Sequence, residues 1–124
     1  HVEVTPVNFT ELASTQDAEK SESIRERVIV AREIQDLRFA TNNNLHYNAQ
    51  MNPKMVRKVC AINESGIMLL KTAMEKLGLS ARAYDRILKV ARTIADLANS
   101  EQIELEHLAE AINYRSLDRS GWAG

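Results

Sequence analysis

The sequence has little cysteine, few aromatic residues and no long apolar run. Its 124 residues include one cysteine, Cys60, so no internal disulfide bond can form. No apolar run approaches the ~18 residues of a membrane-spanning helix. Aromatic residues make up only 5% of the chain. With one thiol and no signal-peptide pattern at the start, the cytoplasm is the expected location, and no membrane contact is expected.

The chain also lacks an excess of either charge. It has 16 basic and 17 acidic side chains, for a net charge of -1. No overall field therefore draws it to nucleic acid or to an anionic membrane, and any such binding needs a local patch. The length suits one domain with one modest core.

A phosphate-binding loop of the G-x-x-x-x-G-K-[ST] type is absent as well. The four glycines are scattered, at Gly66, Gly78, Gly121 and Gly124. No acidic pair follows an apolar run, as a magnesium site would require. We therefore assign no catalytic residue and expect that this chain alone does not hydrolyse ATP.

The N-terminal residues suggest a cut edge. Residues 1–9 (HVEVTPVNF) alternate apolar and polar side chains, which predicts a short strand-like leader. Residues 10–20 show no periodicity and are interpreted as a linker. A single strand cannot satisfy its own backbone, so residues 1–20 are expected to come from a longer protein whose core lies upstream.

Apolar periodicity predicts an all-α bundle of about five helices for the rest of the chain. The first helix is expected to begin near Ser21 or Ser23, where Ser23 and Glu26 fit a capping box, and to end near Arg38. A loop follows at 41–52. The expected domain covers 21–116, with a tail at 117–124. The other expected helices are 53–60, from Asn63 or Ser65 to Leu77, 80–98 and 104–115.

Three local signals mark the helix ends. Pro53 suits the first turn of a helix. Gly78 is a stop signal, and Ser80 is expected to cap the longest clear helix.

Arg82 is the first candidate binding residue. It lies in the first turn of the helix at 80–98, where the helix dipole disfavours a cation by ~0.3–1 kcal/mol. A helix start offers free N–H groups to an anion, and the planar guanidinium suits phosphate oxygens. Arg86 and Lys89 continue a basic stripe along the same helix. Spacing alone favours a plain solvated face, with Asp85 and Asp96 balancing the charge.

Other ionisable residues have simpler interpretations. Arg92 and Asp96 are spaced for a surface ion pair. Arg38 is one of several arginines that either line a nucleic-acid path, contact a neighbouring subunit or, more commonly, are solvated and paired locally. Cys60 fits a small core residue, and His107 fits a surface or capping residue. No His or Cys spacing suggests a metal site.

Four segments carry a family resemblance. They are LSARAYDRILKVARTIADLA (79–98), HLAEAINYRSLD (107–118), IRERVIVAREIQDLRF (24–39) and NAQMNP (48–53). Together they resemble the C-terminal domain of magnesium-chelatase-like AAA+ ATPases of the ComM type, and HVEVTP resembles the strand that follows the ATPase core. The resemblance covers most of the chain.

The resemblance implies a function in a larger machine. It implies an AAA+ lid domain whose parent binds ATP and Mg²⁺ upstream and assembles as a hexamer, with the upstream core and neighbouring subunits as partners. Arg82 matches the sensor-2 arginine, which touches the terminal phosphate, and Arg86 is the second choice. ComM-type members act in DNA branch migration, so DNA is one candidate substrate, beside a protein or a porphyrin-loading partner.

Two other functions remain open from the sequence. One is a free-standing DNA-binding module in which residues 98–104 join two helices in a helix-turn-helix manner. The near-neutral charge and the absence of aromatics interleaved with the basic residues argue against it. The other is an adaptor whose helices bind a partner protein.

Overall fold

The protein is described by a computed structural model, which covers residues 6–42 and 44–121. The elements are α1 (Pro6–Arg38), the 3₁₀ helix η1 (Asn48–Gln50), α2 (Pro53–Val59), α3 (Glu64–Leu77), α4 (Ala81–Leu97) and α5 (Leu105–Gly121). No strand occurs in the described ranges. The expected all-α bundle of five helices is therefore confirmed.

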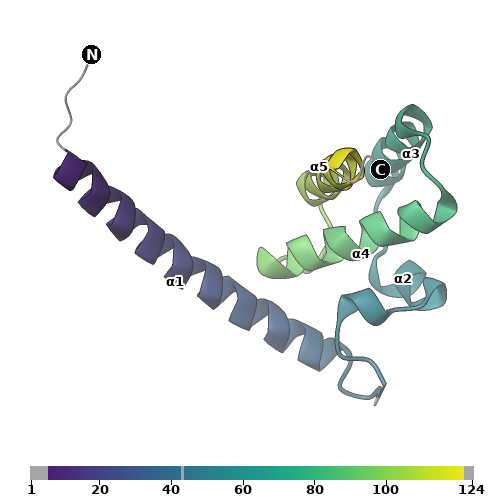
Figure 1. Ribbon diagram of the computed structural model, residues 1–124. Helices are drawn as coiled ribbons and strands as arrows, with labels where there is room; N and C mark the ends of the chain where they lie inside the picture. Colours follow the sequence, from purple (N-terminus) through teal and green to yellow (C-terminus); the bar gives the residue numbers. More distant parts are fainter. Residues whose placement is uncertain (1–5, 43, 122–124) are drawn as a thin grey trace.

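Helix α4 is the centre of the arrangement. It packs against α1, α2, η1 and α5, and α3 packs against α5. In Figure 1, α4 crosses the middle of the bundle, and α1 extends far beyond it toward its N-terminal end. The part of α1 that contacts the bundle is therefore its C-terminal part.

The core lies where α4 meets the other elements. Its buried apolar residues come from α2, α3, α4 and α5, from the residue that follows α1, and from the segments on either side of α2 and before α5. They are Phe39, Met51, Val56, Cys60, Leu70, Ile87, Leu88, Ala91, Ala95, Ile103, Leu108 and Ala111. The strong apolar stripe of α4 explains its central place, because a helix with one apolar face must bury that face.

Helix ends follow the expected signals in the second half of the chain. The side chains of Asn63 and Ser80 accept hydrogen bonds from the third residue along, and so cap α3 and α4. Gly78 ends α3 with a φ of 60°, in the left-handed region where a residue without Cβ is favoured. Pro53 lies in the first turn of α2, where Asn52 is the cap.

The first half of the chain corrects two expectations. Residues 1–5 of the expected strand lie outside the described residues, but from Pro6 the chain is helical, so 10–20 is not a linker. This segment lacks apolar periodicity yet is rich in Ala, Glu, Gln and Lys, which favour helices. The expected capping box at Ser23 is also wrong, because Ser23 lies inside α1.

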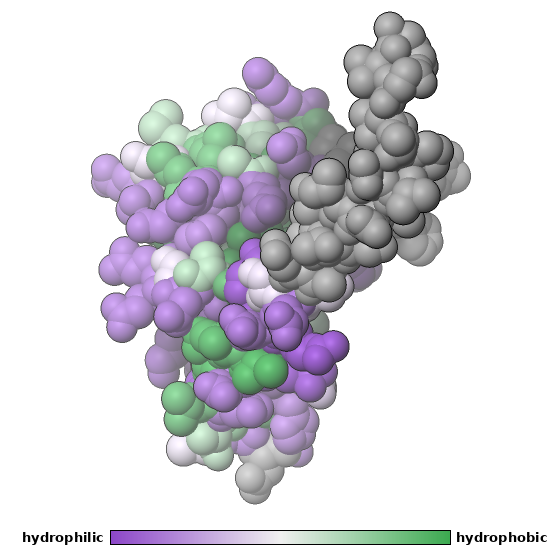
Figure 2. Space-filling model, turned by 90° about the vertical axis from the view of Figure 1, so that its left-hand side faces the viewer, coloured by the Kyte–Doolittle hydropathy of each residue, from purple (hydrophilic) through white to green (hydrophobic). Residues whose placement is uncertain are grey.

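The C-terminal end also differs from the expectation. Helix α5 continues to Gly121, so 117–121 is helical rather than part of a tail. Residues 122–124 of the expected tail lie outside the described residues. None of the described helices is long and apolar enough to cross a membrane. Figure 2 shows a mainly hydrophilic face that is interrupted by hydrophobic patches.

Candidate functional site

Arg82 lies on the open side of the first turn of α4. Its side chain is exposed, and the first turn of this helix holds no acidic residue. The helix start is fixed by Ser80, whose Oγ accepts from the Ala83 N–H at 3.3 Å. No described side chain forms an ion pair with Arg82. Its guanidinium is therefore exposed and unpaired with respect to the described side chains.

Arg86 lies one turn further along α4 and borders a groove between α4, α5 and η1. This α4–α5 groove has a volume of about 600 Å³. Its floor is apolar and its rim holds two cations, a threonine hydroxyl and a tyrosine ring. The lining residues are Ala49, Arg86, Ile87, Lys89, Val90, Thr93, Ile94, Ala111 and Tyr114. None of these described lining residues is a carboxylate.

The groove brings together residues that the sequence kept apart. Tyr114 of α5 is 66% exposed and lines the same groove as Arg86 and Lys89 of α4. The Lys89 Nζ donates to the Ala49 carbonyl oxygen at 3.1 Å, which holds this cation at the rim. The aromatic and basic residues are thus combined by the fold and not by their order in the sequence. Arg82 does not line this groove.

The opposite end of α4 holds a buried polar network around Asp96. Arg38, in the last turn of α1, donates to both carboxylate oxygens of Asp96 at 2.8 Å. Asn48 of η1 donates to Oδ2 at 2.8 Å. Arg92 donates through Nε to Oδ1 at 3.2 Å. The carboxylate thereby ties α1, η1 and α4 together.

The same network reaches the turn after α4. Arg92 donates to the carbonyl oxygens of Ser100 at 2.6 Å and Glu101 at 2.8 Å. Asn48 also accepts from Arg38 at 2.8 Å and donates to the Thr93 hydroxyl at 3.1 Å. Each buried polar group therefore has partners, which is the condition for a buried ionic network to be tolerated.

Two opposing effects act on the pKa of Asp96. Burial of its side chain, which is 0% exposed, acts to raise the pKa. The hydrogen bonds from Arg38 and Asn48, together with the charges of Arg38 and Arg92, lower it by more. The pKa of Asp96 therefore lies below its ordinary value, and the group stays ionised at neutral pH.

This network corrects two expectations. Arg92 and Asp96 do pair at the expected spacing, but the pair is buried rather than on the surface. Arg38 is neither solvated nor paired with a close neighbour, because its partner Asp96 is 58 positions away. The sequence carries one signal of this buried pair. Arg92 and Asp96 interrupt the apolar stripe of α4, each next to a buried alanine, Ala91 or Ala95.

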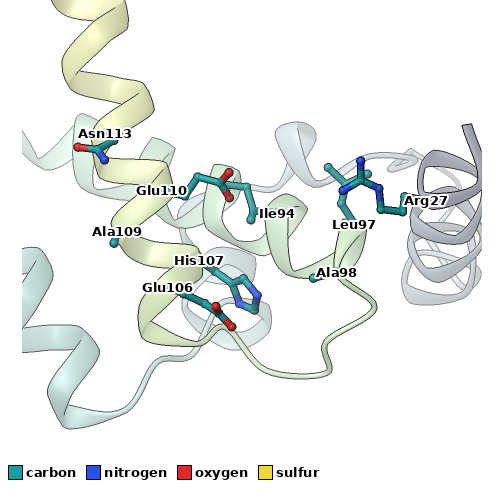
Figure 3. A pocket seen from close by; sticks show the side chains of 9 residues that line it. All are labelled: Arg27, Ile94, Leu97, Ala98, Glu106, His107, Ala109, Glu110 and Asn113. Carbon is teal, nitrogen blue, oxygen red and sulfur yellow. The ribbon is translucent and has the colours of Figure 1, made fainter. Parts of the chain in front are cut away.

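A second groove lies between α1, α4 and α5, with a volume of about 640 Å³. Figure 3 shows Arg27 reaching into it from α1, and Glu106 and Glu110 bordering it from α5. His107 also lines it, but this residue is buried, and its Nδ1 accepts from the Glu104 N–H at 2.9 Å. Of the two expected roles, surface residue or cap, His107 thus has the capping role.

Cys60 shows no sign of reactive chemistry. It is 1% exposed, as expected for a core residue. Burial raises the pKa of its thiol to about 11, against a weaker opposing effect of the Arg92 and Arg38 charges. The thiolate, which is the nucleophile, is therefore scarce at neutral pH. Among the described residues, no three His, Cys, Asp or Glu side chains group as metal ligands do.

Comparison with known proteins gives consistent matches. The family model described as "Magnesium chelatase, subunit ChlI C-terminal" matches residues 18–115. The Competence protein ComM of Haemophilus influenzae is 44% identical over 119 residues, which is 95% of this chain and 22% of that protein. The protein YifB of Escherichia coli is 43% identical over 101 residues, which is 82% of this chain and 19% of that protein.

A further relative matches this chain with similar identity and coverage. The YifB protein of Salmonella typhimurium is 40% identical over 108 residues, covering 85% of this chain and 20% of that protein. The chain therefore spans about a fifth of the length of these relatives. The residues that the family model matches, 18–115, include α4, the described lining of the α4–α5 groove and the Asp96 network.

Proposed function

Because this chain belongs to the family of magnesium chelatase ChlI C-terminal domains, we propose that it is the lid of an AAA+ ATPase. In this proposal Arg82 contacts the terminal phosphate of ATP as the sensor-2 arginine, and Arg86 is the second choice. ATP and Mg²⁺ are held mainly by a core outside this chain. The parent assembles from several subunits in the cytoplasm, with DNA as the proposed substrate.

The observation that carries the proposal is the free cation at the start of α4. Arg82 is exposed and has no ion-pair partner among the described residues. A cation at this position is slightly unfavourable for the helix itself, so it gains stability when an anion arrives. The guanidinium can donate two parallel hydrogen bonds to phosphate oxygens.

The residues present fit a phosphate better than a metal ion. Arg82 and Arg86 are donors only, and a nucleotide's terminal phosphate supplies acceptors. Loss of that phosphate on hydrolysis would remove the partner of Arg82. The lid would then lose one contact that distinguishes the two nucleotide states, which is what a conformational response requires.

The alternative hypothesis, in which α5 binds DNA directly, fits the charges at the start of α5 less well. In a helix-turn-helix manner, α5 would enter the groove of DNA with its N-terminal residues. Those residues include Glu106 and Glu110, which are both exposed, and their carboxylates repel phosphates. We therefore do not propose α5 as a DNA recognition helix. Any DNA contact is proposed for the parent machine.

The test is ATP turnover in a protein of the relatives' length that carries this domain. Arg82→Ala is expected to lower turnover at least about tenfold, because a charge-assisted contact is worth ~1.5–3 kcal/mol. Arg82→Lys keeps the charge but loses the fork, and should give an intermediate loss. Arg57→Ala is the matched control, since Arg57 is also exposed but lies on α2.

Three outcomes separate the alternatives. A loss for Arg82→Ala with normal turnover for Arg57→Ala supports the proposal. A loss for Arg86→Ala alone transfers the role to the second choice. Normal turnover and normal nucleotide-dependent assembly for both Arg82→Ala and Arg86→Ala would remove the nucleotide-sensing assignment.

A further inference from the structure

One side of α1 has no partner in the described chain and combines apolar with acidic side chains. We call it the outer face, and it contains Glu22, Glu26, Ile29, Val30, Glu33, Asp36 and Leu37. At ~3.6 residues per turn, Glu33 lies nearly opposite Ala31 and Gln35, which are buried. The outer face therefore points away from the bundle.

The apolar side chains of the outer face are unusually exposed. Ile29 is 48% exposed, Val30 37% and Leu37 80%. The four acidic side chains are all exposed, and no ion pair to a described side chain involves them. Arg25 and Arg32 border the outer face on the side of Asp36, whereas Arg27 lies on another side of the helix. A face of this kind fits a surface that is apolar and basic.

The α4–α5 groove is such a surface. Its floor is formed by Ile87, Val90, Ile94 and Ala111, and its rim carries Arg86 and Lys89. Among the described residues that line it there is no carboxylate, so its described charges, Arg86 and Lys89, favour an acidic helix. The two surfaces lie on the same chain and are complementary in both charge and polarity.

We infer that the outer face of α1 in one copy of this chain docks in the α4–α5 groove of a second copy. Val30 and Leu37 meet the apolar floor, and Glu26 and Glu33 pair with Arg86 and Lys89. Nucleic acid does not fit the outer face, because its carboxylates repel phosphates. The inference does not depend on the proposed role of Arg82, and it assigns Arg86 to contact between copies.

The test is cross-linking between two single-cysteine variants of the 124-residue chain. Val30→Cys labels the outer face and Ala49→Cys labels the groove, while every charged residue of both surfaces stays in place. Cys60 is buried and its thiol pKa is about 11, so it should react slowly with a short bis-maleimide. At high protein concentration, the mixture is expected to give a cross-linked heterodimer.

Charge reversal makes the test specific. Arg86→Glu with Lys89→Glu in the Ala49→Cys copy should lower the heterodimer yield about tenfold. Adding Glu26→Lys and Glu33→Lys to the Val30→Cys copy should restore it, a result that misfolding of either variant could not produce. Met68→Cys mixed with Val30→Cys measures the background, because Met68 is 70% exposed and lies on α3.

The cross-linking yields test the docking with no nucleotide in the sample. A heterodimer above background, lost on charge reversal and restored by compensation, supports the docking. A yield equal to the Met68→Cys background overturns it, whatever other partner these faces have. A heterodimer that ignores charge reversal also overturns it, since the inferred ion pairs would then be absent.

Discussion

The two ends of helix α4 carry arginines in opposite surroundings. Near the N-terminal end, Arg82 is exposed and has no ion-pair partner among the described residues. Near the C-terminal end, Arg92 is buried, bonded to Asp96 and to two carbonyl oxygens. One helix thus holds a buried cation that is bonded within the fold and an exposed cation that has no ion-pair partner among the described residues.

The two ends of α4 also differ in the hydrogen bonds that hold them to the rest of the fold. The Asp96 network joins the C-terminal part of α4 to α1, to η1 and to the turn before α5. Among the described side chains, the first turn of α4 has no hydrogen bond of this kind beyond its cap at Ser80. A rigid anchor at one end and a free cation at the other suit an element that must hold its position while it meets a ligand.

The largest expected effect comes from breaking the anchored end. Asp96→Asn removes the one carboxylate shared by Arg38 and Arg92, and so leaves Arg92 buried without a counter-charge. We expect the free energy of unfolding in urea to fall by about 3–5 kcal/mol. Asp85→Asn, on the partly exposed side of the same helix, is the control and should change it little. A loss below about 1 kcal/mol for Asp96→Asn would mean that the network is not an anchor.

A smaller effect is expected from acid. The pKa of Asp96 is lowered in the folded chain, so its contribution is fully present above the ordinary carboxyl pKa of ~3.9 and is lost as the pH falls through the folded value. The difference in unfolding free energy between the wild-type chain and Asp96→Asn should therefore shrink below about pH 4. A constant difference from pH 6 down to pH 2 would contradict the lowered pKa.

How far the sequence predicted this molecule depends on the range of the interactions. The caps at Asn63 and Ser80 and the stop at Gly78 are local signals, and the structure confirms each of them. The exposed position of Arg82 and Arg86 also follows from the helical stripe of α4. Local patterns were sufficient wherever a residue's neighbours in space are its neighbours in the chain.

The rest depended on contacts across the fold. Arg38 finds Asp96 over 58 positions, and Tyr114 joins Arg86 and Lys89 only when α5 packs on α4. No spacing rule encodes either contact. The helical course of 10–20 was missed for another reason, since helix propensity without an apolar stripe gives no periodic signal.

The most direct test of the contrast along α4 is a pair of unfolding free energies in this chain. Arg82→Ala should leave the value within about 0.5 kcal/mol of the wild type, because it removes an exposed cation that has no ion pair to a described side chain. Arg92→Ala should lower it by about 3 kcal/mol, because the buried Asp96 carboxylate and the carbonyl oxygens of Ser100 and Glu101 lose a donor. Equal losses for the two variants would contradict the account of one free and one anchored end.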